Sequence, residues 1–414
     1  MEVKPGYKQT EVGVIPEDWD VKTIEQIGFV TSGKRLPLGS SLVKHPTPHP
    51  YVRVTDMRPG TVSLDEIQFV PESVFPAIKR YRIYCDDIFI SVAGSLGIVG
   101  KVPKELDGAN LTENADRITK ITCSQDYLLH VLMSPLIQNT IDSIQTVGAQ
   151  PKLALTRIRK FTVPNPPLPE QRDIATALSD VDGLLGGLDR LIAKKRDLKQ
   201  AAMQQLLTGQ TRLPGFHGEW VVKQLGSVAD VLKGNALSKS LVSASGTRPC
   251  ILYGELFTTY GRVISEIVGR TNSSEGCLSV SGDLLMPGST TTTGADLATA
   301  SALLLDNVAL GGDIIVIRRK DQGYDPIFMA NYLTQARRHE IAKLTQGITI
   351  HHLYGKDVKT LSLRLPSLPE QTAIAEVLTE MDAELAVLEQ RWEKTRALKQ
   401  TMMQELLTGR TRLV

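Results

Sequence analysis

The stretch "LPEQRDIATALSDVDGLLGGLDRLIAKKRDLKQAAMQQLLTGQTRL", residues 168–213, decides the fold because the chain repeats it 200 positions later. The second copy, residues 368–413, is "LPEQTAIAEVLTEMDAELAVLEQRWEKTRALKQTMMQELLTGRTRL". The two copies align without a gap and are identical at about half of their positions, which indicates internal duplication rather than chance. The chain of 414 residues therefore alternates two long shared segments with two segments that differ.

Apolar residues in each copy recur at alternating steps of four and three residues, the spacing of a coiled-coil seam. Pro169 and Pro369 suit a first helical turn, and Gly209 and Gly409 suit the residue just past a helix end. Each copy is therefore predicted to form one helix of about 39 residues, roughly 58 Å long. The predicted seam residues are Ile174, Leu178, Val181, Leu185, Leu188 and Ile192 in the first helix and Ile374, Leu378, Met381, Leu385, Leu388 and Trp392 in the second.

The charges on the two predicted helices favour antiparallel pairing. The first half of the second helix is acidic and the second half of the first helix is basic, so antiparallel packing sets opposite charges side by side. The same distribution also matches the dipole of each helix, which is an alternative explanation of it. The acidic residues are Glu370, Glu376, Glu380, Asp382 and Glu384, and the basic residues are Lys194, Lys195, Arg196 and Lys199.

The two segments that differ, 1–160 and 214–360, contain short β-branched and aromatic runs separated by Gly and Pro, with one or two helical stretches. Each is predicted to be a small α+β domain. With helices in 161–213 and 361–414, the sequence predicts an α+β fold in which two globular domains are separated by an antiparallel coiled coil and related by a pseudo-two-fold internal repeat. The duplicated helices would hold two different domains at a fixed distance.

The composition, 42% hydrophobic and 22% charged with a net charge of +2, is typical of a soluble globular protein. No run approaches the roughly 18 apolar residues of a membrane span. The polar start "MEVKPGYKQT" is not a signal peptide, so we expect a cytoplasmic protein. Cys85, Cys123, Cys250 and Cys277 stand far apart without a CxxC pair, which predicts packing thiols and no metal site.

No motif predicts catalysis. "NPPL", residues 165–168, nearly matches the Asn-Pro-Pro-aromatic motif of adenine methyltransferases but lacks the aromatic residue, so it is predicted to be a proline stop before the helix. "AGSLGIVGKV", residues 93–102, has the wrong glycine spacing for a phosphate loop and is predicted to be a turn or, alternatively, a backbone surface that faces a ligand. His351 and His352 are adjacent, so in a strand they face opposite ways and cannot readily share a metal.

Cations, hydroxyls and aromatic residues cluster at predicted turns of both domains. The first domain has "TSGKRLP" at 31–37, "YVRVTDMRP" at 51–59 and "AIKRYR" at 77–82. The second has "LKGNALSKS" at 232–240, in the position that matches the first of these, and "GSTTTTG" at 288–294. Lys and Arg contact phosphates, whereas Asn, Gln, Ser, Thr and Arg contact base edges. One such cluster alone is also consistent with a solvated surface, but recurrence in both domains favours DNA binding.

The order of variable segment and "LPEQ…LLTG.TRL" helix, written twice, resembles the specificity subunit of type I restriction-modification systems over essentially the whole chain. The start "GVIPEDW" is also typical of that family. The resemblance implies a DNA sequence-specificity subunit without catalysis of its own. Residues 1–160 and 214–360 would be target recognition domains that each recognise one half of a split DNA target, while the helices set the spacer and dock the methyltransferase subunits.

The resemblance also implies partners. Two modification subunits would use S-adenosylmethionine to methylate adenine, and restriction subunits would use ATP and Mg to translocate and cleave DNA. No cofactor is expected in this chain. The DNA contacts expected by this analogy are Lys34, Arg35, Arg53 and Arg58 in the first domain and Lys233, Asn235, Lys239 and Arg248 in the second, with Gln150, Lys152 and His351 from the loop before each helix.

Two other classes of function stay open from the sequence. The chain is also consistent with a coiled-coil scaffold or an orphan DNA-binding protein that lacks an active methylation partner. A methyltransferase or nuclease activity in the chain itself is disfavoured by the absence of a glycine-rich cofactor loop before "NPPL".

Overall fold

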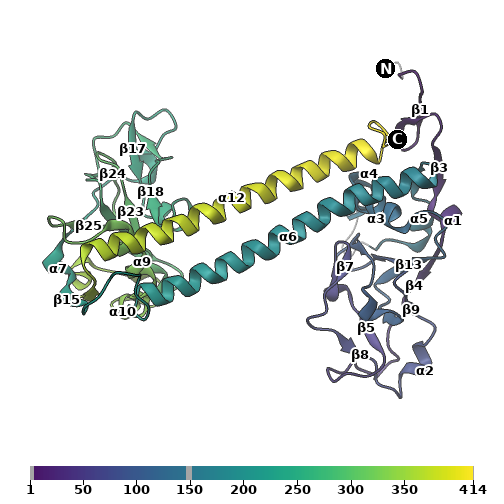
Figure 1. Ribbon diagram of the computed structural model, residues 1–414, viewed down its shortest axis with the longest axis horizontal. Helices are drawn as coiled ribbons and strands as arrows, with labels where there is room; N and C mark the ends of the chain where they lie inside the picture. Colours follow the sequence, from purple (N-terminus) through teal and green to yellow (C-terminus); the bar gives the residue numbers. More distant parts are fainter. Residues whose placement is uncertain (1–3, 146–151, 414) are drawn as a thin grey trace. The chain divides into compact units, whose positions relative to one another are not determined.

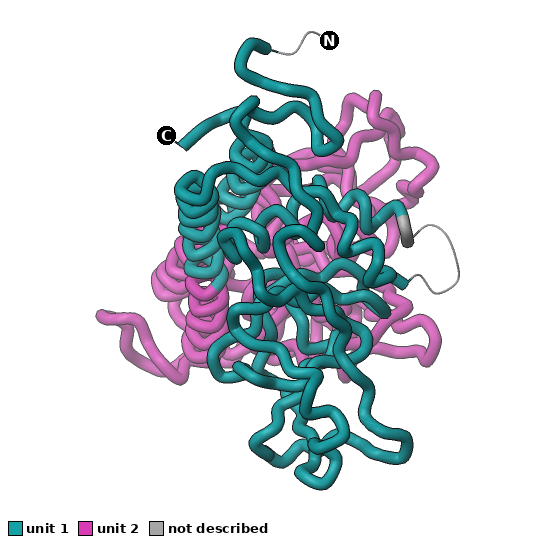
Figure 2. The backbone as a smooth tube through the Cα atoms, turned by 90° about the vertical axis from the view of Figure 1, so that its right-hand side faces the viewer, with its two compact units in different colours: residues 1–189, 390–414 teal, residues 190–389 magenta. Residues whose placement is uncertain are grey.

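The computed structural model describes residues 4–145 and 152–413. It divides the chain into two compact units, which Figure 2 shows in different colours. Unit 1 comprises residues 1–189 and 390–414, and unit 2 comprises residues 190–389. Each unit therefore combines one mixed domain with part of each repeated segment.

The two repeated segments form the long helices α6 (Leu168–Leu206) and α12 (Leu368–Leu406), of 39 residues each, as predicted (Figure 1). In unit 1, Ile174 and Leu178 near the start of α6 share a core with Met403 and Leu406 near the end of α12. The two helices therefore run antiparallel in unit 1.

Unit 2 contains the reciprocal arrangement. Ile374 and Leu378 near the start of α12 share a core with Met203 and Leu206 near the end of α6. The predicted antiparallel pairing is thus confirmed in both units, and the charges agree with it. The ion pairs are Lys195 with Glu384 at 2.6 Å, Arg196 with Glu389 at 2.6 Å and Lys199 with Asp382 in unit 2, and Lys399 with Asp182 at 2.5 Å in unit 1.

The twelve predicted seam residues are all withdrawn from solvent at least in part. Ile174, Leu178, Leu188, Ile192, Ile374, Leu378 and Leu385 are buried, and Val181, Leu185, Met381, Leu388 and Trp392 are half-buried. Gly209 and Gly409 follow the helix ends with φ of 72° and 67°. This left-handed conformation favours glycine and ends each helix where the sequence predicted.

Unit 1 contains two four-stranded sheets, with the strand orders β11-β10-β13-β4 and β8-β5-β12-β9. The central strand β10 is a continuous apolar run that is buried along its whole length, because α3 and the helix pair cover the sheet. The strands are β4 (Phe29–Ser32), β5 (Pro50–Val52), β8 (Gln68–Phe69), β9 (Arg82–Ile83), β10 (Ile88–Ser91), β11 (Val99–Gly100), β12 (Ala109–Leu111) and β13 (Ala115–Thr119).

Unit 2 repeats this plan with the orders β16-β25-β21-β23-β18 and β19-β17-β24-β20. The sheet β8-β5-β12-β9 of unit 1 corresponds to the sheet β19-β17-β24-β20 of unit 2. Each of these two sheets contains one parallel pair, β12 with β5 in unit 1 and β17 with β24 in unit 2. The strands are β16 (Ala229–Lys233), β17 (Arg248–Ile251), β18 (Val263–Ile264), β19 (Arg270–Thr271), β20 (Cys277–Leu278), β21 (Asp283–Pro287), β23 (Ser301–Leu303), β24 (Ala309–Leu310) and β25 (Ile314–Arg319).

Short ribbons and helices complete the units. The ribbons pair β1 (Tyr7–Thr10) with β2 (Gly13–Pro16), β3 (Asp20–Thr23) with β14 (Thr162–Asn165), β6 (Met57–Arg58) with β7 (Thr61–Val62), β15 (Val221–Gln224) with β27 (Ser362–Leu365), and β22 (Ser289–Thr290) with β26 (His351–His352). The helices are α1 (Ile24–Ile27), α2 (Phe75–Ile78), α3 (Gln125–Met133), α4 (Pro135–Gln145), α5 (Leu155–Arg159), α7 (Leu225–Val228), α8 (Glu255–Thr258), α9 (Pro326–Gln335), α10 (Arg338–Lys343) and α11 (Gly355–Val358). In the part of the chain that the structure describes, none of the helices is long and apolar enough to span a membrane.

The repeated "LPEQ" motif joins each long helix to its domain. The side chain of Gln171 accepts a hydrogen bond at 2.8 Å from the backbone N–H of Ser124, the residue that caps α3. Gln371 accepts the equivalent bond at 3.0 Å from Asp325, which caps α9. The motif therefore occurs twice because the same helix-to-domain joint is built twice.

The glutamate before each of these glutamines is buried and paired with an arginine. In unit 1, Glu170 accepts hydrogen bonds from Arg412 at 2.5 and 2.8 Å and from the Trp19 indole N–H at 3.0 Å. Arg412 also donates to both carboxylate oxygens of Asp18, at 3.0 and 2.9 Å, and Asp18 and Glu170 raise the pKa of Arg412. This junction joins the two ends of the chain, since Tyr7 also donates to the Gly409 carbonyl at 3.0 Å.

The junction in unit 2 has fewer side-chain partners. Arg212 pairs with both carboxylate oxygens of Glu370, one at 2.5 Å, and donates to the backbone carbonyl of Gly218 at 2.7 Å. The indole N–H of Trp220 is buried and has no hydrogen-bond partner among the described residues. Here the arginine and the tryptophan lie eight positions apart on one continuous segment.

Candidate nucleic-acid interface

β4 in unit 1 and β16 in unit 2 are edge strands of corresponding sheets. Each is followed by a glycine that packs against the backbone of another segment. A Cβ atom on Gly33 would lie 2.0 Å from the Thr112 carbonyl oxygen, and one on Gly234 would lie 1.8 Å from that of Gly311. No side chain fits at either position. The residue that follows is tied in the same way in both units, which makes the predicted contacts Lys34 and Asn235 structurally equivalent.

The chain leaves the sheet at Gly33 and Lys34 in unit 1 and at Gly234 and Asn235 in unit 2. We call this place in each unit the sheet-end site. The N–H of Lys34 donates to the Leu111 carbonyl at 2.8 Å, and the N–H of Asn235 donates to the Leu310 carbonyl at 3.2 Å. Both side chains are exposed. The frame of the site is therefore shared by the two units, while the residues that it presents differ.

The sheet-end site of unit 1 contains a small basic hollow of about 300 Å³. The Lys34 ammonium lies 5.8 Å from the centre of the Tyr81 ring, and Arg117 pairs with the buried Asp87 at 3.0 Å. The lining residues are Thr31, Ser32, Gly33, Arg80, Tyr81, Arg82, Leu111 and Arg117. Three arginines, two hydroxyls and an aromatic ring suit an anionic ligand that also stacks, as a nucleotide does.

The sheet-end site of unit 2 contains a larger hollow of about 600 Å³. Lys233 at the end of β16 lies 3.6 Å from Asp313 and remains three-quarters exposed. The Lys356 ammonium lies 5.7 Å from the Tyr354 ring, and His352 stacks beside that ring at 6.1 Å. The hollow therefore combines cations with an aromatic ring, as the unit 1 hollow does, but with different residues, and Tyr354 is exposed whereas Tyr81 is half-buried.

The threonine-rich loop that the sequence singled out begins beside this hollow. Its second and third residues, Ser289 and Thr290, form β22, which pairs with His352 and His351 of β26. The hydroxyls of Thr292 and Thr293 donate to Asp296, at 2.7 and 2.8 Å, and lower the pKa of its carboxyl. The corresponding segment of unit 1 is the short glycine-containing turn at 93–97, so this loop is a difference between the units.

All four arginines that the sequence predicted as DNA contacts are held by other residues of the chain. Arg35 pairs with Glu113 at 2.7 Å, Arg53 pairs with the buried Asp56 at 2.6 Å, and Arg58 donates to the Thr55 and Met57 carbonyls at 2.9 and 2.8 Å. Arg248 donates to the backbone carbonyl of Ser273. Arg53 and Arg58 therefore stabilise their own loop, whereas Arg35 keeps most of its side chain exposed.

The remaining predicted contacts lie in several places. Lys152 is exposed in the segment before α5, and Lys239 is exposed at the start of a short 3-10 helix, Lys239–Leu241. His351 lies in β26 and is half-buried. Gln150 lies outside the described residues.

The structure corrects one prediction about the cysteines. Cys250 is buried and Cys123 is half-buried, with burial raising the pKa of Cys123 to about 11, as expected of packing thiols. Cys85, however, is exposed, because it lies in the turn after β9 and not in the core. Within residues 4–145 and 152–413, no three His, Cys, Asp or Glu side chains gather closely enough to hold a metal ion.

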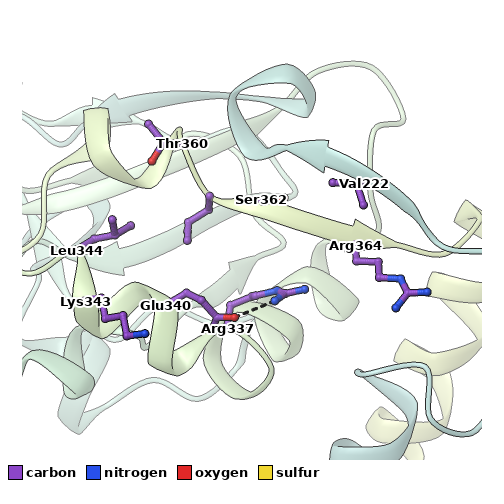
Figure 3. A pocket seen from close by; sticks show the side chains of 9 residues that line it. Val222, Arg337, Glu340, Lys343, Leu344, Thr360, Ser362 and Arg364 are labelled. Atoms are coloured by element: carbon purple, nitrogen blue, oxygen red, sulfur yellow. Dashed lines mark hydrogen bonds and ion pairs between the residues drawn. The ribbon is translucent and has the colours of Figure 1, made fainter.

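Unit 2 has a further basic hollow, of about 490 Å³, between the β15–β27 ribbon and α10 (Figure 3). Arg337 is fixed there by Tyr332 at 2.8 Å and by Glu340 at 2.9 Å. Arg364 pairs across the ribbon with Val222. In unit 1 the equivalent cross-strand position is a proline, Pro164, so this hollow lacks its arginine counterpart there. The sequence does not indicate the hollow of unit 2, because the cations that line it are separated by up to 27 positions.

The family model described as "Type I restriction modification DNA specificity domain" matches residues 16–192 and 217–395. The putative type I restriction enzyme MjaX specificity subunit of Methanocaldococcus jannaschii is 26% identical over 98% of this chain and 97% of its own length. The MjaVIII specificity subunit of the same organism is 23% identical over 96% of this chain and 94% of its own. In fold, the chain resembles the solved S subunit of a type I system from M. genitalium, with a TM-score of 0.58, 14% identity and 98% of both chains covered.

Proposed function

The chain belongs to the family of type I restriction-modification DNA specificity subunits, and we propose that each of its two units recognises one half of a two-part DNA target. As a specificity subunit it recognises sequence and leaves catalysis to other subunits. The observation that carries the proposal is the sheet-end site, since a similar glycine-tied frame presents Lys34 in one unit and Asn235 in the other. A shared frame with different exposed residues suits two readers of different sequences.

We assign recognition to residues 1–160 and 214–360, and we assign spacing and subunit docking to 161–213 and 361–414. The long helices support the docking role because apolar side chains outside the seam remain exposed on them. Leu184 is 43% exposed, and Leu191 and Leu198 follow at steps of seven residues with 39% and 48% exposed. Unpartnered leucines at this spacing suit a further helix of a partner protein.

The partners proposed for this chain are double-stranded DNA, two modification subunits and restriction subunits. S-adenosylmethionine would be bound by the modification subunits, and ATP and Mg by the restriction subunits. The predicted cytoplasmic location fits an assembly that acts on DNA. A coiled-coil scaffold or orphan DNA-binding protein is the alternative, and the family membership does not favour it.

The test is sequencing of modified bases in cells that carry the neighbouring modification gene, with and without this chain. The expected result is N6-methyladenine in a two-part motif only when the chain is present. Replacing residues 1–160 with the same segment of another family member should then change one half of the motif and leave the other half intact. A change in both halves would contradict the two-reader proposal, and proteins that co-purify without any motif would favour the scaffold.

A further inference from the structure

One surface segment occupies the same place in both units and is basic in both. It is residues 152–160 in unit 1 and 352–360 in unit 2. The N–H of Leu153 donates to the Val92 carbonyl at 3.0 Å, and the N–H of Leu353 donates to the Gly288 carbonyl at 2.8 Å. The short helices α5 and α11 follow, and each buries one aliphatic residue completely. The backbone of the segment is therefore fixed to the domain in the same way twice.

The cations of this segment are exposed, and none of them has an acidic partner among the described residues. They are Lys152, Arg157, Arg159 and Lys160 in unit 1 and Lys356 and Lys359 in unit 2. Across residues 4–145 and 152–413 none of these six forms an ion pair. A cation without an acidic partner breaks no ion pair within the chain when it binds an external anion. Two of the six have other contacts, since Arg159 donates to the Val30 carbonyl at 3.3 Å and Lys356 lies over the Tyr354 ring. This distinguishes the six from Arg35 and Arg53, which already have carboxylate partners.

Four of the six cations adjoin the sheet-end sites. In unit 2, Lys356 and Lys359 line the same hollow as Lys233 and Tyr354. In unit 1, the positive charges of Lys152 and Arg159 act on Asp116, which accepts a hydrogen bond at 2.7 Å from Ser32 at the end of β4. Burial nevertheless raises the pKa of Asp116. Each unit thus has unpaired cations next to the residues that differ between the units.

We propose that these two segments bind the phosphates of duplex DNA and set its register on each unit, while the residues that follow Gly33 and Gly234 contact the bases. The proposal rests on the proposed function and deepens it. Arg159 and Lys359 occupy equivalent positions, and they share a charge but not a hydrogen-bonding geometry. A phosphate accepts either side chain, whereas recognition of a base edge depends on the geometry.

The experiment compares the full-length chain with the double variant Lys356→Ala/Lys359→Ala in binding to two unrelated duplexes of equal length over a range of salt concentrations. Each phosphate contact contributes about 0.9 to the slope of log K against log salt. The slope should therefore fall in magnitude by up to about 1.8, and the affinity for both duplexes should fall by the same factor. Arg159→Ala/Lys160→Ala should have the same effect through unit 1.

The matched control is Lys194→Ala, which removes an exposed lysine from α6 and should leave the slope unchanged. Lys359→Gln keeps most of the side-chain length and tests charge apart from packing. An unchanged slope in variants that retain the wild-type melting temperature would overturn the proposal, as would a loss confined to one duplex, which would indicate base contact. If the wild-type chain shows no salt-dependent duplex binding, the proposed function itself fails.

Discussion

The junction at the end of α12 and the junction at the end of α6 are built from the same residue types but held in different ways. In unit 2 the arginine and the tryptophan belong to one continuous segment, and Glu370 is the one carboxylate that pairs with Arg212 within residues 4–145 and 152–413. In unit 1 they come from opposite ends of the chain, and Arg412 pairs with two carboxylates, Asp18 and Glu170. The tryptophan of unit 1 also donates to the buried glutamate, whereas that of unit 2 does not.

The difference shows how chain connectivity and non-covalent contacts substitute for each other. Where the backbone is continuous, a short loop brings the arginine and the tryptophan together at a small entropic cost. Where the backbone is interrupted, the same geometry needs additional contacts to offset the entropy of ordering two free ends. Unit 1, where the backbone is interrupted, has these additional contacts: Arg412 donates to Asp18, and Trp19 donates to Glu170.

The largest effect is expected from Arg212→Ala. Glu370 is 1% exposed, and the change removes the one cation that pairs with it in the described part of the chain, so unit 2 should lose about 3–5 kcal/mol of stability. Arg412→Ala should destabilise unit 1 by about 1–2 kcal/mol less than Arg212→Ala destabilises unit 2, because Trp19 still donates a hydrogen bond to Glu170. Hydrogen exchange of peptides from α9 and α3, measured against urea, reports each unit separately.

The control for this pair is Arg410→Ala, which removes an exposed arginine that lies 3.8 Å from Glu405 and should have little effect. Equal losses in Arg212→Ala and Arg412→Ala would show that the additional partners of unit 1 contribute nothing to its stability.

The second prediction concerns acid. His130 in α3 lies 3.2 Å from Ser179 of α6, and burial, followed by the charge of Lys399, lowers its pKa to about 4. The folded state favours the neutral ring, so its contribution is present above the ordinary pKa of about 6.5 and is lost as the pH falls toward 4. Unit 1 should weaken by up to about 1.4 kcal/mol per pH unit in that window. Unit 2 has Asn331 at the equivalent position of α9 and should not share this loss.

The measurement is the urea dependence of exchange in α3 and α9 peptides at several pH values between 6.5 and 4. His130→Asn copies the residue of unit 2 and should remove the extra acid sensitivity of unit 1. If the two units still differ in acid sensitivity by the same amount in this variant, another group is responsible.

The smallest effect is expected from the tryptophans. Trp19→Phe and Trp220→Phe both reduce the ring, but only Trp19→Phe removes a hydrogen bond to a buried carboxylate. The loss in unit 1 should exceed the loss in unit 2 by about 1–2 kcal/mol. Urea unfolding of the two variants, followed in each unit by hydrogen exchange, measures this difference. Equal losses would mean that the indole N–H contributes no net stability.

The helices could be predicted from the sequence because their signals are local. A heptad seam, a proline in the first turn and a glycine just past the end all lie within the segment that they define. The role of Glu170 could not be predicted, because its partner Arg412 is 242 positions away. The charge pattern gave the orientation of the helices, since it depends on whole helix halves and not on single contacts.

The candidate DNA contacts were predictable only by region. The sequence indicated the cluster that contains Arg53 and not the segment that contains Arg159, yet Arg53 is bound to Asp56 and Arg159 has no ion pair among the described residues. The partner that neutralises a cation can be three positions away, as for Arg53, or 78 positions away, as for Arg35 and Glu113. The composition of a segment does not show which of its cations form ion pairs in the folded chain. The sequence therefore did not indicate the cations of the short helices α5 and α11.

The heptad seam restricts how the length of the helical pair can change in evolution. An insertion of one residue rotates all later side chains by about 100°, which removes the seam from its partner, whereas an insertion of seven restores the face. Because each helix is paired near both of its ends, both helices must change together. Seven residues lengthen a helix by about 10.5 Å, close to the rise of three base pairs. Under the proposed function, a new DNA spacer would therefore require a discrete change of helix length, coordinated in two distant parts of one gene.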